Sequence, residues 1–295
     1  MKLVSYDSAG SWRPGIVVDS SVFDVDTLLK GNRGENARPI SSVSELLREY
    51  GAGLAELSER LTVAARLKPQ AVVGTFDKVR LGPPVTDPSK VLCIGLNYND
   101  HVAETGRALP SHPDIFAKFA STLIGPFDEI RCSGITQNLD FEGELAIVIG
   151  KECRGVTAEE ALDFVAGVTV LNDITARDLQ YRGTQWLAGK AVDASTPCGP
   201  ALVTLDEVGD VQELSIQTRV NGAQVQSSNT RYMIFPVREL VSYISFFLTL
   251  SPGDIITTGT PQGIGAKRQP PLWLKPGDTV EVELQNVGVL RNVVR

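Results

Sequence analysis

The stretch LDFEGELAIVIG, residues 139–150, contains the kind of segment from which the fold of this chain can be predicted. Its second half, ELAIVIG, is a short apolar run that ends at a glycine, a pattern typical of a β-strand. Similar runs recur along the rest of the chain, namely VLCIGLN, AGVTVLND, ALVTL, SIQTRVNG, DIITTG and TVEVEL. Strand-like segments therefore dominate the sequence from Lys90 to the C-terminus.

Two helices are predicted among these strands. Thr157 and Glu160 have the spacing of a capping box, which opens a helix over AEEALDFV. Pro236 opens the second helix, at the first helical position that proline favours, and this helix ends before Pro252-Gly253. Because helices are few and do not alternate regularly with strands, the sequence predicts a β-rich α+β core.

The first 85 residues have a different pattern. The runs KLVSYD, GIVVD and VFDVD predict strands of a small sheet. Residues 42–67 carry apolar side chains on a helical period, which Gly51 and Gly53 split into two helices. The proline-rich segment LGPPVTDPSK, residues 81–90, suits an extended connector. We therefore predict a small N-terminal α+β domain, residues 1–85, and a larger domain, residues 86–295.

Composition excludes several classes of protein. The chain has 28 basic and 35 acidic residues among 295, a net charge of −7 that offers no basic footprint for nucleic acid. The longest apolar stretch, residues 240–250, is shorter than the roughly 20 residues that span a bilayer. The N-terminus lacks the apolar core of a signal peptide, and four cysteines are scattered without a CxxC pair. We expect a cytoplasmic protein that binds neither nucleic acid nor membrane.

Two carboxylates in the opening stretch carry the first chemical signal. Glu142 and Glu144 are two residues apart on the predicted strand, so their side chains share one face, about 6–7 Å apart along the backbone. Like charges so placed are compensated by a divalent cation, or else they lie on a solvated edge strand. Asp173, at the end of the run VAGVTVLND, favours the cation, although it could instead cap the segment that follows. Three carboxylates without histidine select a hard cation such as Mg²⁺, Mn²⁺ or Ca²⁺.

Five further residues are candidates for the chemistry. His101 and Glu104 are spaced so that one helical turn would let Glu104 orient the imidazole, which could then activate water; the alternative is a surface histidine. Lys190, in QWLAGKAVD, could neutralise a developing enolate. Arg177 could bind a substrate carboxylate in a two-pronged contact, with Gln180 on the same helical face, or could be ordinary surface charge.

From about Lys90 onward the chain resembles the fumarylacetoacetate hydrolase family. The resemblance is carried by IGLNYNDHVAETG, LDFEGELAIVIG, VTVLNDITARDLQ, QWLAGKAVD, TPCGPALV, SNTRYMIF, LSPGDIITTGTPQGIG and LKPGDTVEVEL, in matching order and spacing. Within the family it is similar to the acylpyruvase-like members, which act on 2,4-diketo acids, and residues 1–85 look like the N-terminal appendage of longer members.

The resemblance implies a core of mixed β-sheets rolled around the site, in a homodimer. It implies Mg²⁺ (or Mn²⁺) on Glu142, Glu144 and Asp173. It also implies three further sets of site residues, namely a His101–Glu104 dyad on a lid, an essential lysine at Lys190, and substrate contacts at Gln180 and Thr260.

These implications favour a metal-dependent hydrolase that cleaves a C–C bond of a 2,4-diketo acid. The dyad would activate water for attack on the distal carbonyl, and Lys190 with the metal would stabilise the leaving enolate. The alternatives are an oxaloacetate-type decarboxylase that forms the same enolate, or an isomerase or dehydratase of a 2-keto acid. A non-enzymatic scaffold is disfavoured because every candidate residue is present.

Overall fold

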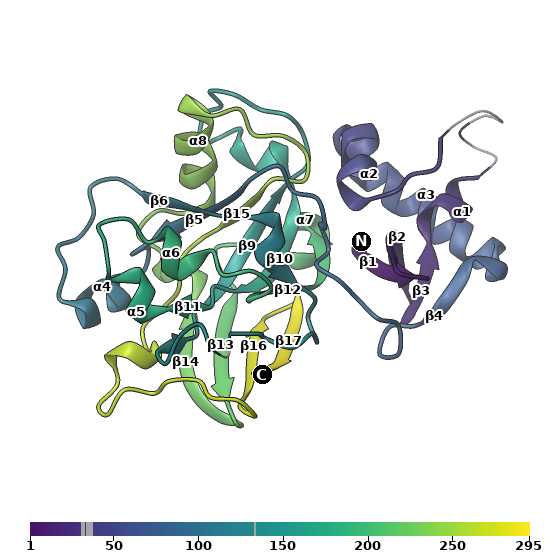
Figure 1. The fold of residues 1–295 in the computed structure, drawn as a ribbon. Helices are drawn as coiled ribbons and strands as arrows, with labels where there is room; N and C mark the ends of the chain where they lie inside the picture. The colour runs from purple at the N-terminus through teal and green to yellow at the C-terminus, as the bar shows by residue number, and fades with distance from the viewer. Residues whose placement is uncertain (31–32, 34–37, 133) are drawn as a thin grey trace.

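The computed structural model describes residues 1–30, 33, 38–132 and 134–295, which form two lobes (Figure 1). The N-terminal lobe is a meander of antiparallel strands with helices packed against it, and its apolar runs form the strands that the sequence predicts. Its strands are β1 (Lys2–Ser8), β2 (Ser11–Val18), β3 (Ser21–Asp24) and β4 (Val72–Thr75). Its helices are α1 (Val25–Leu29), α2 (Val43–Tyr50) and α3 (Leu54–Leu67).

The split between α2 and α3 is confirmed. A single 3-10 turn, Gly51–Gly53, separates the two helices at the glycines singled out above. Gly51 is also a close approach between the lobes, because a Cβ there would lie 1.9 Å from the carbonyl oxygen of Gly150. Only glycine fits at this position without moving the backbone.

The larger lobe contains a long mixed sheet. Its strands are β5 (Val91–Gly95), β6 (Asp114–Lys118), β7 (Leu123–Ile124), β9 (Gly143–Ile149), β10 (Val165–Asn172), β12 (Thr196–Thr204) and β15 (Ile255–Thr257). The strand order β4-β3-β2-β1-β12-β10-β9-β15-β5-β6 includes the N-terminal meander. The link is a short antiparallel ladder, in which Lys2 faces Val203 and Leu3 faces Leu202. One sheet therefore crosses the predicted boundary at residue 85, and the division into two domains stays a prediction.

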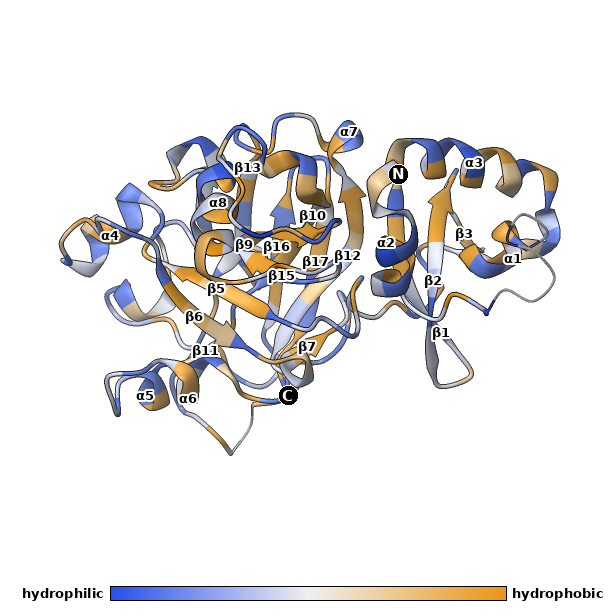
Figure 2. Cartoon of the chain, turned by 90° about the horizontal axis from the view of Figure 1, so that it is seen from above, coloured by the Kyte–Doolittle hydropathy of each residue, from blue (hydrophilic) through white to orange (hydrophobic). Residues whose placement is uncertain are grey.

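A second sheet packs on the first. It has the order β14-β13-β16-β17, with β13 (Ser215–Val220), β14 (Ala223–Asn229), β16 (Thr279–Leu284) and β17 (Gly288–Val293). Apolar side chains from both sheets, such as Ile147, Val168, Ile216 and Val282, form one buried cluster. Figure 2 shows the hydrophobic colouring of the central strands that this packing requires. The β-rich α+β fold predicted from the sequence is confirmed.

Short helices and loops complete the larger lobe. The helices are α4 (Asn99–Thr105), α5 (Arg177–Gln180), α6 (Leu187–Lys190), α7 (Leu205–Val208) and α8 (Val237–Phe247), and a small ladder joins β8 (Leu139–Asp140) to β11 (Thr175–Ala176). The helix predicted after Pro236 is α8, although Pro236 is its N-cap and not its first residue. Within the described residues, no helix combines the length and apolar character that crossing a membrane demands.

The helix predicted over AEEALDFV is wrong. The capping-box contacts exist, since Thr157 and Glu160 each accept a hydrogen bond from the other's backbone N–H. Only a 3-10 turn, Ala161–Phe164, follows them. Val165 then enters β10, where it pairs with Ile149 of β9. The pairing of β10 with its neighbour thus overrides the local helix signal.

Candidate functional site

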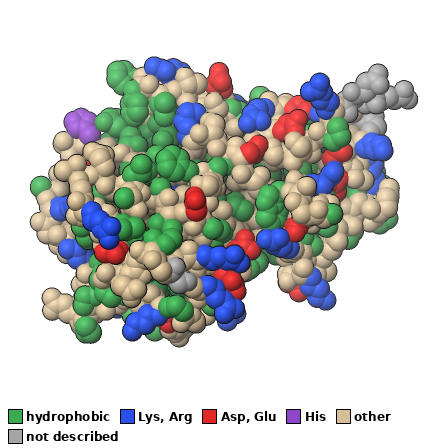
Figure 3. Space-filling view, viewed as in Figure 1, with side chains coloured by type: hydrophobic (Ala, Val, Ile, Leu, Met, Phe, Trp, Pro, Cys, Tyr) green, Lys and Arg blue, Asp and Glu red, His purple; other side chains and the backbone are tan. Residues whose placement is uncertain are grey.

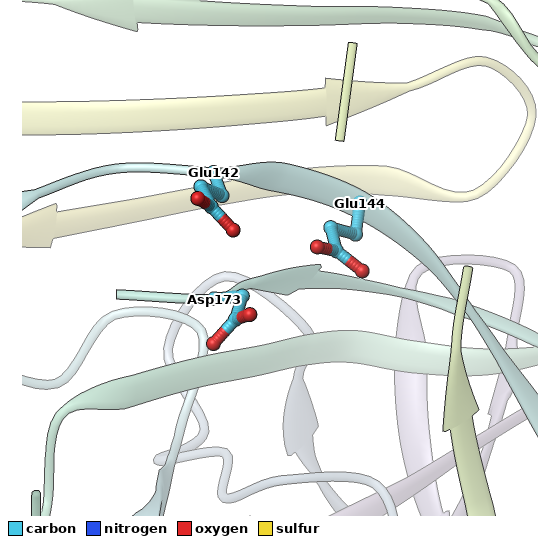
Figure 4. Close-up of side chains that lie close together, drawn as sticks. All are labelled: Glu142, Glu144 and Asp173. Carbon is cyan, nitrogen blue, oxygen red and sulfur yellow. The ribbon is translucent and has the colours of Figure 1, made fainter. Parts of the chain in front are cut away.

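The pairing of β9 with β10 brings three carboxylates together. Glu144 is the second residue of β9, Glu142 directly precedes this strand, and Asp173 directly follows β10. The backbone N–H of Asp173 donates to the carbonyl of Glu142 over 2.8 Å, which closes the end of the ladder. One carboxylate oxygen from each residue lies within 4.8 Å of the others, and Figure 4 shows the three side chains close together at the ends of neighbouring strands.

These carboxylates are buried, with 6 %, 1 % and 0 % of Glu142, Glu144 and Asp173 exposed. The solvated edge strand considered above is therefore wrong, because β9 lies between β10 and β15 inside the sheet. The alternative role of Asp173 as a helix cap is also wrong, since the next helix, α5, has Ala176 as its N-cap.

Two of the carboxylates are paired with cationic side chains. Lys190 donates to Glu142 over 2.7 Å and to Asp173 over 2.6 Å, and Arg177 donates to Glu142 over 2.5 Å. Burial alone would raise the pKa of Glu142, but Lys190 and Arg177 outweigh it and lower this pKa to about 2. Burial likewise opposes the charge of Lys190, yet Asp173 and Glu142 raise its pKa. Both groups are therefore charged at neutral pH.

Sequence reasoning missed a second buried lysine. Lys118, the last residue of β6, is 2 % exposed and donates to Asp173 over 2.7 Å and to the carbonyl of Ile174 over 3.2 Å. The sequence feature that could have identified Lys118 is a lysine inside the apolar run IFAKF. Its partner, Asp173, lies 55 residues further along the chain. Asp173 is thus held between two ammonium groups.

Glu144 has a different environment. Its carboxylate accepts a hydrogen bond from the backbone N–H of Gly259 over 2.8 Å, and among the described residues no cationic side chain forms a salt bridge with it. Burial, followed by the charges of Asp173 and Glu142, raises the pKa of Glu144 well above its usual range. A buried carboxylate that faces like charges is stabilised by a cation in the space between them. The three side chains therefore fit a hard divalent cation.

His101 and Glu104 form the predicted pair on one turn of α4. Nδ1 of His101 lies 2.7 Å from Oε1 of Glu104, and the second oxygen of Glu104 accepts the backbone N–H of Gly263 over 2.9 Å. His101 is only 6 % exposed, so the surface histidine considered above is wrong. With Nδ1 bound to the carboxylate, Nε2 is the ring nitrogen left for other partners.

A cavity of about 180 Å³ collects most of these side chains. Among the predicted site residues, those that line it are His101, Glu142, Glu144, Arg177, Gln180, Lys190 and Thr260. Glu104 and Asp173 lie just behind this wall, bonded to His101 and Lys190. The rest of the lining includes Ile94, Phe116, Trp186, Ile264, Arg107 and Lys267, none of which the sequence singled out.

The predicted substrate contacts are held by neighbouring protein groups. Arg177 donates to Asp140 over 2.8 Å and to the side-chain oxygen of Gln180 over 3.0 Å, so its guanidinium is a buried part of the wall and not surface charge. Thr260 accepts from Gln226 over 2.8 Å and donates to the carbonyl of Gly143 over 3.1 Å. These residues face the cavity with their orientation fixed.

Comparison with known proteins agrees with this picture. Residues 90–295 match the family described as Fumarylacetoacetate (FAA) hydrolase C-terminal. The human protein named oxaloacetate tautomerase FAHD2A, mitochondrial, is 48 % identical over 237 residues, which cover 79 % of this chain and 76 % of that protein. A 2,4-didehydro-3-deoxy-L-rhamnonate hydrolase from a Sphingomonas strain is 40 % identical over 90 % of this chain and 94 % of its own length.

Solved structures match along the whole chain. Fumarylacetoacetate hydrolase from psychrophilic Exiguobacterium antarcticum has 35 % identity and a TM-score of 0.83, and covers 100 % of this chain and 99 % of its own. Maleylpyruvate hydrolase from a Sphingobium strain, in complex with manganese and pyruvate, has 28 % identity and a TM-score of 0.77, and covers 100 % of this chain and 98 % of its own. The predicted mixed-sheet roll is confirmed, and the chain belongs to the fumarylacetoacetate hydrolase family.

Proposed function

We propose that this chain is a divalent-metal-dependent enzyme that interconverts the keto and enol forms of a 2-oxo acid such as oxaloacetate. One observation carries the proposal. The imidazole of His101, fixed at Nδ1 by Glu104, lines the same small cavity as the carboxylate cluster and the ammonium of Lys190. A proton-transfer group and a site that stabilises an oxyanion thus meet where a small 2-oxo acid fits.

The residues of the cluster hold the metal in this proposal. Glu142, Glu144 and Asp173 bind Mg²⁺ (or Mn²⁺), which when bound supplies a Lewis acid for the 2-oxo group. Gln180, Thr260 and Arg177 form the wall against which the substrate carboxylate and carbonyl are positioned.

His101 moves the proton. In the keto-to-enol direction its Nε2 removes a proton from C3 of the substrate, and the electron pair of that C–H bond moves into the C2–C3 bond. Negative charge then develops on the carbonyl oxygen, where Lys190 stabilises it until the imidazolium of His101, directly or through water, gives a proton to that oxygen and becomes neutral again. Glu104 stabilises the imidazolium that forms, through its 2.7 Å contact to Nδ1. The reverse sequence returns the proton to C3.

Hydrolysis of a 2,4-diketo acid is the second candidate. It uses the same enolate but needs His101 to activate a water molecule for attack on the distal carbonyl. The 40 % identity to a hydrolase that matches this chain over 90 % of its length supports it. Tautomerisation comes first because it needs only proton transfers and no positioned water, and because the 48 % identical relative carries a tautomerase name.

A parallel assay distinguishes these reactions. The purified protein with Mg²⁺ or Mn²⁺ is given oxaloacetate and a series of acylpyruvates, while enol absorbance, diketone absorbance and CO₂ release are followed. We expect faster loss of the oxaloacetate enol without matching CO₂ release. Diketone cleavage without enol interconversion would establish the hydrolase instead, and CO₂ release in step with oxaloacetate loss would establish a decarboxylase.

We also propose that the protein forms the homodimer expected from the sequence, and that the end of α8 lies in its interface. Phe246 and Phe247 at the end of α8 are 78 % and 48 % exposed, and hydrophobic side chains gather over this helix in Figure 3. Exposed aromatic side chains of this kind are common where a second chain packs. Light scattering of the wild type and of Phe246→Asp tests this proposal. The wild type should have the molar mass of a dimer and the variant that of a monomer.

The cytoplasmic location stays a prediction, and the names of several relatives place those proteins in mitochondria.

A further inference from the structure

Among the residues that the structure describes, four Lys and Arg side chains line the cavity, and two of them already form salt bridges. Lys190 is bonded to two carboxylates, and the guanidinium of Arg177 is shared between Asp140, Glu142 and Gln180. The other two are Arg107 and Lys267, which are exposed. Within the described part of the chain, neither of them has a salt-bridge partner, so each retains its charge for a ligand.

Arg107 is the more firmly placed of the two. Its guanidinium carbon lies 5.5 Å from the centre of the Trp186 ring, in a cation–π contact. Trp186 is in turn fixed edge-to-face against Phe116, with ring centres 5.4 Å apart. The indole also lies against Gly95, where a Cβ would come within 2.6 Å of the ring. The guanidinium is thus held on a rigid aromatic wall at the cavity.

The position of Arg107 in the chain links it to the proton-transfer group. It follows α4, which carries His101, and is joined to that helix through Gly106 in the left-handed conformation, with φ of 70°. An anion bound by Arg107 therefore also holds the end of α4 against the cavity. Lys267, by contrast, follows a separate loop and ends a 3-10 turn, Gly265–Lys267, with no comparable support for its ammonium.

We propose that Arg107 binds the distal carboxylate of a dicarboxylic 2-oxo acid, and so determines the preference of the cavity for dicarboxylic over monocarboxylic substrates. The inference rests on the proposed function, since it takes the 2-oxo end of the substrate to lie at the carboxylate cluster. The planar guanidinium suits the task because it can donate two parallel hydrogen bonds to one carboxylate.

Binding is tested apart from turnover with a ligand that is not turned over, because it has a nitrogen atom in place of the C3 that would lose a proton. N-oxalylglycine and its glycine methyl ester differ only in the distal carboxylate, and each is titrated by calorimetry into the wild type, Arg107→Met and Lys267→Met with Mg²⁺ present. We expect the wild type to prefer the diacid and Arg107→Met to lose about 10- to 100-fold in affinity for it, the range for hydrogen bonds to a charged group. The affinity of the ester should change little.

Lys267→Met is the matched control, since it removes one charge from the same rim. It should keep the preference for the diacid. Equal affinities of the wild type for diacid and ester, no binding of either ligand, or loss of the preference in Lys267→Met but not in Arg107→Met would each overturn the assignment. Failure of the proposed function appears elsewhere, as absence of enol interconversion with oxaloacetate in the wild type.

Discussion

Each of the two lobes buries a carboxylic acid whose pKa is shifted, and the two shifts have opposite directions. In the N-terminal lobe, Asp24 accepts hydrogen bonds from Tyr6 over 2.6 Å, from Arg13 over 3.0 Å, and from both the backbone and the hydroxyl of Thr27. Burial alone would raise the pKa of Asp24, but these contacts from Thr27, Tyr6 and Arg13 outweigh it and lower the pKa. In the larger lobe, Glu144 faces carboxylates and its pKa is raised.

The difference separates a structural cluster from a binding site. Asp24 caps α1 and stabilises the fold without any bound ion, because all of its hydrogen-bond donors are groups of the protein. Glu144 destabilises the metal-free fold, since its charge is compensated only when a cation lies between it and its neighbours. The complete protein partners of Asp24 therefore indicate a structural role, whereas the like charges around Glu144 indicate a place for a cation.

The largest expected effect follows from removing a proposed metal ligand. Replacing any one of the three carboxylates by alanine should abolish measurable catalysis, because two carboxylates alone leave the cation with too few ligands. The variants are Glu142→Ala, Glu144→Ala and Asp173→Ala. Asp24→Ala, although it also removes a buried acid, should keep its kcat/KM at temperatures where it is folded. Steady-state kinetics on the four variants checks this, and a Glu144→Ala enzyme with wild-type turnover would contradict it.

The proton-transfer pair should give the next largest effect. His101→Ala should lower kcat by about 100-fold or more, the usual contribution of general acid–base catalysis, while metal affinity survives. Glu104→Gln should be milder, because the amide oxygen can still accept a hydrogen bond from Nδ1. Turnover and calorimetric Mn²⁺ affinity are measured on the same preparations. Near-parental turnover of His101→Ala would leave the reaction without its base.

Stability of the metal-free protein should change in opposite directions in the two lobes. Glu144→Gln should raise the free energy of unfolding, because it removes a carboxyl group whose ionisation is opposed in the folded state by burial and by the charges of Asp173 and Glu142. Asp24→Asn should lower it by about 1–3 kcal/mol, because it disrupts hydrogen bonds to a charged group. Denaturant unfolding in the presence of a chelator measures both. Destabilisation by Glu144→Gln in that buffer would show that the cluster is structural after all.

The smallest effect is expected in the pH dependence of stability. The changes in the free energy of unfolding caused by Glu144→Gln and by Asp24→Asn should each vary with pH. The raised pKa of Glu144 means that its cost is absent below the unfolded pKa of about 4.3 and grows as pH rises through that value. The lowered pKa of Asp24 means that its contribution is present above about pH 3.9 and is lost as pH falls further. Between pH 4.5 and 7 the gain from Glu144→Gln should therefore grow while the cost of Asp24→Asn stays level.

Local sequence was sufficient for the strands and for the carboxylate cluster. The run ELAIVIG predicts β9, and the spacing of Glu142 and Glu144 gives them a shared face whatever the strand pairs with. The spacing of His101 and Glu104 also needed only one helical turn.

Long-range partners could not be predicted in the same way. The contact of Lys118 with Asp173 spans 55 residues, and that of Lys190 with Glu142 spans 48, so both depend on the sheet order. The contact of Arg177 with Asp140 likewise spans 37 residues, and the expected contact of Arg177 with a substrate carboxylate stays a prediction. Arg107 became a candidate only when the fold placed it over Trp186.

Calorimetric titration of Mn²⁺ into chelator-treated protein tests whether the cluster of Glu142, Glu144 and Asp173 holds a divalent cation. The wild type and Asp24→Asn should bind one Mn²⁺ per chain with the same affinity. Glu144→Gln should bind far more weakly, although it is expected to be the more stable protein without metal. Equal Mn²⁺ affinity of Glu144→Gln and the wild type would show that the carboxylate of Glu144 does not bind the cation.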